Sequence, residues 1–324
     1  MSILKTFIDK TINSFGKLKV KVRDIVSSIV EAARTISYVE TVSNKADTLH
    51  RYIKQNSENN IKKSFEFNTR KAIGRMGLGK TTLAIDTTSE IYYGKNGKMN
   101  VRQKRFEKGA SEAFDYVVLS IVKPKPLPLM ALPYRQGDDI TTLVKELLDY
   151  AKSLSMIIQC VLFDRGFYIG ELIDYLSSEK IRYLIFVPQN KAMKKYISQT
   201  KTIASFNHEI KYNKRKSWWK TQTRIVIIKD SRAEDYFWCF ATNLRQSLYL
   251  ISKYKQRWQI ETDFRVHDEA RIKTKSNEPI IRYFYFLTSL VLLANWEVNR
   301  LLHPKICFKK YLKFVQEEFE KEIT

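Results

Sequence analysis

The sequence predicts an α/β protein, with a mixed sheet flanked by helices, an inserted antiparallel β subdomain and a helical N-terminal region. Between residues 82 and 188, short apolar and β-branched runs alternate with amphipathic stretches at helical spacing. Residues 189–250 instead combine alternating strand patterns with an excess of basic side chains. Residues 1–72 carry apolar residues mostly at helical spacing. A chain of 324 residues is long enough for two or three domains and a sizeable core.

The N-terminal region, residues 1–72, is expected to hold amphipathic helices over residues 20–39 and 45–55. Two helices joined by a tight turn fit a helix-turn-helix, whose second helix enters the major groove of DNA. In that case Arg51 and Lys54, on the polar side of the second helix, are candidate DNA-binding residues. A plain helical bundle with solvated basic side chains fits the pattern equally well, so both interpretations stay open.

The predicted core begins with residues 80–188. Its expected strands and helices are, in order, Leu83–Ile85, Tyr116–Val122, Ile157–Phe163 and Tyr183–Val187 as strands, with Ile140–Ser153 and Tyr168–Ser178 as helices. Residues 123–128, Lys-Pro-Lys-Pro-Leu-Pro, are interpreted as a loop, and a proline-rich ligand motif is the alternative.

Residues 189–250 are expected to form the inserted basic β subdomain, with antiparallel strands over 223–228 and 236–242. The core is expected to resume with the helices of residues 251–302. No Gly or Pro interrupts residues 246–275, which predicts one long helix there. The apolar stretch 283–302 is interpreted as a buried core helix and not a membrane span, because its second half carries polar residues. Residues 303–324 are expected to be a basic tail.

The composition points to a polyanionic partner. The chain holds 57 Lys and Arg against 34 Asp and Glu, a net charge of +23, so nucleic acid is the simplest partner. Cys160, Cys239 and Cys307 are scattered, which excludes a disulfide framework or a zinc ribbon as the organising principle. We find no signal-peptide pattern and expect a soluble cytoplasmic protein without membrane contact.

Three acidic residues stand out by their contexts. Asp86 and Asp164 each end an apolar run, where a carboxylate projects from the edge of a sheet. Glu261 lies on the predicted long helix, after Tyr254 and Arg257 at helical spacing. Hard divalent cations prefer oxygen ligands, and two such ions can activate a nucleophile and stabilise the leaving oxygen in phosphoryl transfer. For any one of these acids, a cap or a surface charge is the commoner role, so the prediction depends on all three.

In these contexts the chain resembles the DDE transposases of bacterial and archaeal insertion sequences, whose catalytic domain is RNase H-like. It is similar to the subgroup that has a Tyr-x2-Arg-x3-Glu-x6-Lys signature and a β insertion before the last acid. The likeness extends over about residues 80–300. The matching residues are Ala84–Thr88 with Tyr92–Lys95, then Phe163–Phe167, then Tyr254, Arg257 and Glu261.

The resemblance implies that Asp86, Asp164 and Glu261 are the catalytic residues and bind Mg²⁺ or Mn²⁺, two ions in all. It implies cut-and-paste transposition, with DNA strand cleavage followed by strand transfer. The implied partners are double-stranded DNA with terminal inverted repeats, target DNA and a second copy of the chain in a synaptic homodimer. The implied location is the nucleoid of a prokaryotic cell.

One position departs from the signature: Asp268 stands where its Lys is expected. On a continuous helix, Tyr254, Arg257, Glu261, Arg265 and Asp268 share one face. Tyr254, Arg257 and Arg265 are then expected to position a DNA phosphate, with Arg265 supplying the missing cation. Asp268 is expected to weaken binding of the DNA end or to mark an inactive copy. A ladder of charges on a solvated helix is the alternative.

Trp218 and Trp219 lie in a basic segment, residues 214–220. Flat aromatic side chains among cations can stack on unpaired bases, so both are candidate DNA-binding residues. A role in the core or on an edge strand is the alternative.

A second hypothesis comes from Gly74–Thr81, which matches the P-loop pattern G-x4-G-K-[ST] in every letter, and Asp164 would then be a Walker B acid. The context disagrees, because residues 64–73 are too polar for the buried strand that precedes a P-loop. Five of the eight residues 81–88 are also β-branched, where a helix should begin. Nucleotide hydrolysis therefore ranks below transposition, and a non-catalytic DNA-binding remnant of a transposase is the third hypothesis.

Overall fold

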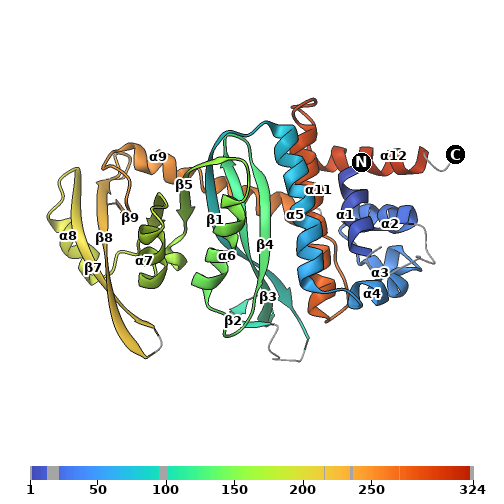
Figure 1. The fold of residues 1–324 in the computed structure, drawn as a ribbon, viewed down its shortest axis with the longest axis horizontal. Coiled ribbons are helices and arrows are strands. Elements are labelled where there is room, and N and C mark those ends of the chain that lie inside the picture. Colours follow the sequence, from blue (N-terminus) through green and yellow to red (C-terminus); the bar gives the residue numbers. More distant parts are fainter. Residues whose placement is uncertain are drawn as a thin grey trace.

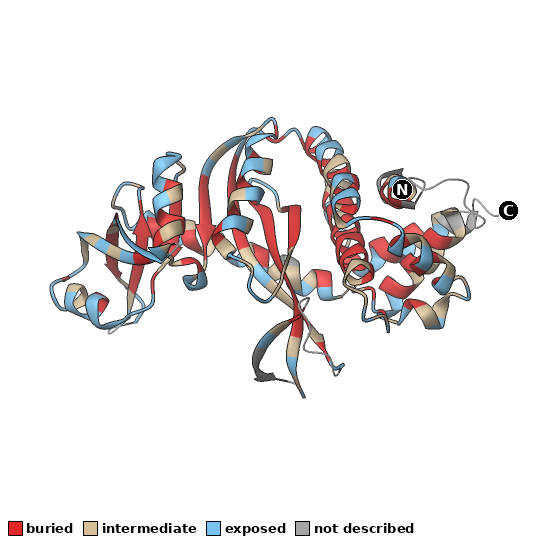
Figure 2. Ribbon diagram, turned by 60° about the horizontal axis from the view of Figure 1, so that its bottom comes forward, coloured by how far each residue is buried: buried red, intermediate tan, exposed pale blue. Residues whose placement is uncertain are grey.

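A nine-stranded mixed sheet extends through the molecule, with a bundle of helices packed at one end (Figure 1). The computed structural model describes residues 2–12, 22–94, 101–107, 109–214, 216–233, 236–269 and 271–321. The predictions made for residues 20–21, Lys95 and residues 322–324 lie outside this part of the chain. Buried residues run through the central strands and along helix α11, which crosses the bundle (Figure 2).

The strands follow the order β2-β3-β1-β5-β6-β9-β8-β7 across the sheet, and β4 pairs with β3. Their bounds are β1 Lys80–Tyr92, β2 Arg102–Glu107, β3 Ala110–Lys123, β4 Leu127–Tyr134, β5 Ile157–Phe163, β6 Tyr183–Phe186, β7 Ile203–Lys214, β8 Ser217–Lys229 and β9 Phe237–Thr242. Strands β1, β5 and β6 run parallel, and the other pairs are antiparallel. The predicted fold class, an α/β protein with a mixed sheet flanked by helices, is confirmed.

The strands of the insertion extend the central sheet. Strand β9 pairs with β6, with Ile185 opposite Ala241, and β8 continues the sheet on the other side of β9. The strands predicted at 223–228 and 236–242 are present, but they are not a separate layer. Helix α7 (Gly170–Ser178) packs against this part, and α8 (Lys191–Ser198) follows β6.

The N-terminal helices form a bundle with two helices from the end of the chain. The bundle holds α1 (Ser2–Ile12), α2 (Val22–Thr35), α3 (Val39–Val42), α4 (Ala46–Lys54), α5 (Glu58–Met76), α11 (Pro279–Asn299) and α12 (Phe308–Lys321). The predicted helix at 45–55 is α4; Arg51 is exposed on it, and Lys54 forms an ion pair with Glu278 at 3.2 Å. A role of this bundle in DNA binding stays a prediction.

Helix α11 is buried along most of its length, as expected for a core helix. No helix in the described ranges combines the length and the apolar character that a membrane crossing needs. The predicted basic tail is largely helical, because α12 occupies most of it.

The predicted long helix over residues 246–275 is wrong. Two helices, α9 (Tyr249–Lys255) and α10 (Trp258–Asp268), meet at a tight turn. At this turn the amides of Gln256 and Arg257 donate to carbonyls only three residues back, at 3.2 and 2.8 Å, so the helix tightens locally to 3-10 geometry. Because neither Gly nor Pro marks the turn, the sequence pattern gave no sign of it.

The loop predicted at residues 123–128 is present but shorter, because residues 124–126 connect β3 to β4 and β4 begins at Leu127. Pro128 and Pro133 are tolerated there because β4 pairs with β3 alone, so its other edge needs no amide donors. Helix α6 (Ile140–Lys152) follows it close to the predicted bounds and is capped by Asp139, whose carboxylate accepts the amides of Thr141 and Thr142.

The P-loop hypothesis is wrong, because the motif residues lie on a helix that is followed by a strand, the reverse of the order that a P-loop requires. Gly74 is inside helix α5, Gly77 ends the helix in the left-handed conformation, and Lys80 begins strand β1. A P-loop needs strand, loop and then helix, whereas this segment runs helix, loop and then strand. Backbone amides here cap a helix end: the Gly77 amide donates to the Ile73 carbonyl at 3.1 Å.

We expect opposite effects from alanine at two of these glycines. Gly77→Ala should lower the free energy of unfolding by about 1–2 kcal/mol, because its φ of 60° is strained for a residue with a Cβ. Gly74→Ala should raise it by about 1 kcal/mol, because Gly74 is within a helix and a Cβ there meets nothing within 4 Å. Urea denaturation of the two variants tests this; effects of the same sign would contradict the assigned helix end.

Candidate active site

Strand pairing brings Asp86 and Asp164 together. Strands β1 and β5 are parallel, with Ile85 opposite Phe163, so the two aspartates are the next residues on neighbouring strands. Neighbouring strands lie about 4.8 Å apart, and paired residues point to the same face. Asp86 therefore shares the face of Ala84, and Asp164 stands where β5 ends. This juxtaposition follows from two buried apolar runs that lie side by side.

Helices α9 and α10 cover this face of the sheet. Ala84 belongs to a small apolar core that also includes Tyr254 of α9 and Ile260 of α10. The packing carries Glu261, which follows Ile260, to the same side as Asp86. Asp86 and Glu261, which are far apart in the sequence, thus lie on one face, and Asp164 stands at the end of the neighbouring strand β5.

The guanidinium of Arg257 connects these elements. One of its nitrogens, Nη1, donates to Asp86 Oδ2 at 2.6 Å, and the other, Nη2, donates to Glu261 Oε1 one turn further along α10. The third, Nε, donates to the Tyr254 hydroxyl at 3.2 Å. Arg257 is almost fully buried and lies at the turn between α9 and α10. The turn that interrupts the helix is therefore the point at which α10 attaches to β1.

The electrostatics of the site indicate a shortage of positive charge. Burial raises the pKa of Asp86 to about 6, although Arg257 and the Thr87 amide lower it, and nearby Asp164 and Glu261 raise it further. Three carboxylates and one guanidinium carry a net charge of −2 when all are ionised. A single buried cation does not offset three carboxylates.

Burial lowers the pKa of the Arg257 guanidinium, but Tyr254 and the three carboxylates raise it more, so the net shift is upward. The guanidinium thus stays charged. Asp86 has a side chain only 13 % exposed, whereas Glu261 is 52 % exposed, so the site opens to solvent on the α10 side. Asp164 precedes a short 3-10 helix (Arg165–Phe167) without capping it, which leaves its carboxylate available.

The chemistry of these donors fits a hard divalent cation. Asp86, Asp164 and Glu261 offer carboxylate oxygens, which Mg²⁺ and Mn²⁺ prefer, and their excess negative charge favours such an ion. Among the described residues, no three His, Cys, Asp or Glu side chains have the spacing of a metal site as they stand. The Arg257 guanidinium occupies the space between Asp86 and Glu261.

The other predicted phosphate-binding residues divide into buried and exposed groups. Tyr254 is buried and packs against Phe186 and Phe240 at ring-centroid distances of 5.6 and 5.2 Å. This packing fixes the tyrosine, whose hydroxyl accepts a hydrogen bond from Arg257. Arg265 and Asp268 are exposed on α10. Tyr254, Arg257 and Glu261 share one face, because Arg257 donates to both of the others, but Tyr254 and Arg257 are buried, so the alternative of a solvated charge ladder is excluded for them. Phosphate binding by Arg265 stays a prediction.

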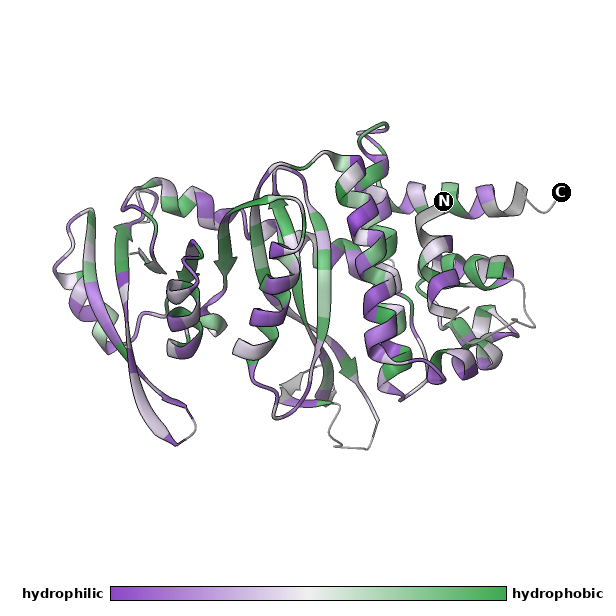
Figure 3. Cartoon of the chain, in the orientation of Figure 1, coloured by the Kyte–Doolittle hydropathy of each residue, from purple (hydrophilic) through white to green (hydrophobic). Residues whose placement is uncertain are grey.

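Trp218 and Trp219 lie towards the far end of the β7–β8 hairpin and are 74 % and 53 % exposed. Both are exposed because this part of β8 pairs with β7 alone; pairing with β9 begins only at Arg224. The hairpin projects from the sheet and is mostly hydrophilic (Figure 3). Exposure excludes a core role for the two tryptophans, and base stacking stays a prediction.

Two residues near the site were missed by the sequence analysis. Glu90 lies on β1, four residues after Asp86, and the Nε of Arg271 donates to Glu90 Oε1 at 3.2 Å. Glu90 could have been found from the sequence, because residues 86 and 90 are an even number of positions apart on one strand and therefore share a face. Nothing local connects it to Arg271, because the two are 181 positions apart.

Comparison with known proteins supports the predicted class. Residues 122–282, just under half of the chain, match the family described as "Transposase DDE domain". The matched segment includes Asp164 and Glu261 and begins after Asp86. No curated protein sequence matches the chain.

The fold is similar to that of a solved transposase. The structure titled "Cryo-EM structure of piggyBac transposase synaptic complex with hairpin DNA" has a TM-score of 0.60 to this chain at 12 % sequence identity. The similarity covers 98 % of this chain and 77 % of that one. At this identity the likeness concerns the fold.

We expect Asp86→Asn to stabilise the protein at neutral pH. Because the folded pKa of Asp86 is raised from 3.8 to about 6, wild-type stability should fall as pH rises between these values, by up to about 3 kcal/mol. The variant should lack this fall and exceed wild type at pH 7.5, while the two should be similar at pH 4. Urea denaturation without divalent ions measures the difference. Exposed Asp149 provides the control substitution; a loss of stability at pH 7.5 in Asp86→Asn would contradict the prediction.

Proposed function

We propose that the protein is a DDE-type DNA transposase that moves an insertion sequence by cut-and-paste, with strand cleavage followed by strand transfer. The observation that carries the proposal is that Asp86 and Glu261 bind one buried guanidinium, with Asp164 at the end of the strand beside Asp86. The match of residues 122–282 to the transposase DDE domain supports it. So does the likeness in fold to a transposase.

In this proposal Asp86, Asp164 and Glu261 hold two Mg²⁺ or Mn²⁺ ions. Such ions activate water or a 3′-hydroxyl for in-line attack and stabilise the leaving oxygen. The acids bind the ions as carboxylates, so Asp86 must lose its proton. Arg257 keeps Asp86 and Glu261 on the same side of the sheet and offers a fork of donors that also suits a phosphate. Transesterification conserves the phosphodiester bond, so the reaction needs no ATP.

The DNA is proposed to lie along the basic surfaces outside this site. Helix α8 exposes Lys191, Lys194 and Lys195, and the β7–β8 hairpin beyond it exposes the two tryptophans. With a net charge of +23, phosphate contacts should supply most of the affinity, which should fall steeply with salt. Terminal inverted repeats, target DNA and a synaptic homodimer belong to the proposal.

A second candidate is a DNA-binding protein that does not cleave. Asp268 favours it, because a negative charge replaces the Lys of the signature, while the basic surfaces elsewhere on the protein are retained. The two candidates differ in one property, metal-dependent cleavage.

The main test is cleavage of DNA that carries the genomic sequence on either side of the gene. Wild-type protein with Mg²⁺ should nick the element ends, and Asp86→Ala, Asp164→Ala and Glu261→Ala should each reduce nicking about 100-fold or more. All variants should still bind the DNA, and Asp149→Ala, at an exposed acid, should cleave as wild type does. Equal cleavage by all proteins would refute the catalytic assignment, and binding without cleavage by wild type would favour the second candidate.

Removal of both exposed tryptophans should weaken binding to DNA with unpaired ends. Stacking of a base on an aromatic side chain contributes about 1–3 kcal/mol, so Trp218→Ala with Trp219→Ala should raise the Kd about tenfold or more at fixed salt. Affinity for fully paired DNA should change less, and Phe314→Ala, at an exposed ring on α12, is the control. Fluorescence anisotropy measures both; an unchanged Kd for unpaired ends would rule out stacking.

A further inference from the structure

Strand β1 carries two ion pairs that hold helix α10. Asp86 pairs with Arg257 at the start of α10, and Glu90 pairs with Arg271 just after its end. Four residues along a strand span about 13 Å and return to the same face. The eleven residues of α10 span about 16 Å. The helix that carries Glu261 is thus attached to one strand at both ends.

The Glu90–Arg271 pair is largely removed from water. The side chains of Glu90 and Arg271 are 10 % and 27 % exposed. Loss of one partner in such a pair leaves a buried charge without compensation, so the pair strongly favours one position for the end of α10. The pair does not belong to the carboxylate site, because Arg271 donates to neither Asp86 nor Glu261 among the described contacts.

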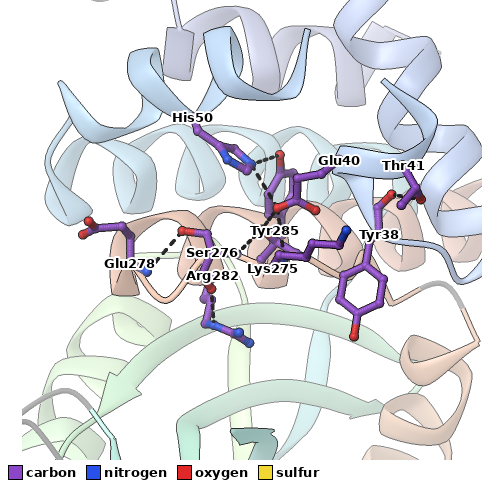
Figure 4. A network of polar contacts seen from close by, with 10 residues as sticks. Tyr38, Glu40, Thr41, His50, Lys275, Ser276, Glu278, Arg282 and Tyr285 are labelled. Atoms are coloured by element: carbon purple, nitrogen blue, oxygen red, sulfur yellow. Dashed lines mark hydrogen bonds and ion pairs between the residues drawn. The ribbon is translucent and has the colours of Figure 1, made fainter. Parts of the chain in front are cut away.

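Residues 271–278, which we call the strap, connect α10 to α11 and are also held from the opposite side. The Thr274 hydroxyl and the Lys275 amide donate to Glu40 Oε1 at 2.6 and 2.9 Å. Figure 4 shows Lys275 and Ser276 of the strap beside Glu40 and His50 of the N-terminal helices. The strap is thus joined to β1 through Arg271 and to the bundle through Thr274 and Lys275.

We propose that Glu90 and Arg271 are positioning residues that keep Glu261 in the carboxylate site. This inference rests on the proposed function. If Arg257 turns to a DNA phosphate or gives way to divalent ions, the bond between Asp86 and α10 is lost. The Glu90–Arg271 pair then remains as the ion pair that fixes α10 on β1. Without it the helix pivots, and the Glu261 carboxylate no longer meets Asp86 and Asp164.

The test is Mn²⁺ binding to the full chain without DNA, measured by isothermal titration calorimetry. Glu90→Gln should raise the Kd for Mn²⁺ about tenfold or more, because one of the three carboxylates is no longer held in place. Glu297→Gln is the matched control, since it removes another buried glutamate that pairs with a partly exposed arginine, Arg300 just after α11, at 3.0 Å. The control should bind Mn²⁺ within twofold of wild type, and urea denaturation of both variants separates global stability from metal binding.

Arg271→Gln gives a second, independent measurement, since Arg271 is more exposed than Glu90 and its loss disturbs folding less. It should weaken Mn²⁺ binding as Glu90→Gln does, and the double variant should be no weaker than either, because the two residues act as one pair. If Glu90→Gln does not fold, Arg271→Gln decides.

The outcomes separate the two proposals. Wild-type protein that binds no Mn²⁺ would overturn the proposed function and the inference with it. Wild-type protein that binds Mn²⁺, together with variants that bind it equally well, would overturn the inference alone. Losses that add in the double variant would also overturn it.

Discussion

The burial of Arg257 between carboxylates is the constraint on which this part of the structure depends. Charges removed from water need partners, and the guanidinium supplies donors to both Asp86 of β1 and Glu261 of α10. The contact explains why the chain turns between α9 and α10 and why α10 lies on the sheet face that carries Asp86. It also leaves the site short of positive charge, because burial and two further carboxylates keep the pKa of Asp86 near 6. In the proposed function, divalent cations supply the positive charge that Arg257 alone does not provide.

Strand β1 contacts most of the elements that surround the candidate site. It pairs with β3 on one side and with β5 on the other, so one strand sets the position of Asp164 and of the proline-containing β4 beyond β3. Along one face it presents Asp86 and Glu90, each bound to an arginine that flanks α10. The strap after α10 then contacts the N-terminal bundle through Glu40. A continuous set of polar contacts therefore connects the carboxylate site to the helices at the end of the molecule.

The sequence predicted the features that depend on local pattern. The apolar runs ending in Asp86 and Asp164 became neighbouring strands because burial of both runs favours their pairing, and the register followed. The features it missed depend on distant contacts. The turn at Arg257 is imposed by a carboxylate on another strand, and Arg271 finds Glu90 across 181 positions. The P-loop pattern of Gly74–Thr81 failed for the opposite reason: its letters matched, but helix α5 precedes it where a strand is required.

The boundaries of the family match separate Asp86 from the other two acids. The matched segment begins at residue 122, so Asp86 is outside it, although Asp164 and Glu261 are inside. Taken alone, the segment contains two of the three acids and lacks the residue to which Arg257 donates at 2.6 Å. The parallel pairing of β1 with β5 restores the third acid, because Ile85 opposite Phe163 leaves Asp86 beside Asp164. The candidate site therefore forms only in the folded sheet. Sequence similarity covers two of the three acids, and the register of β1 with β5 places the third, Asp86, beside Asp164.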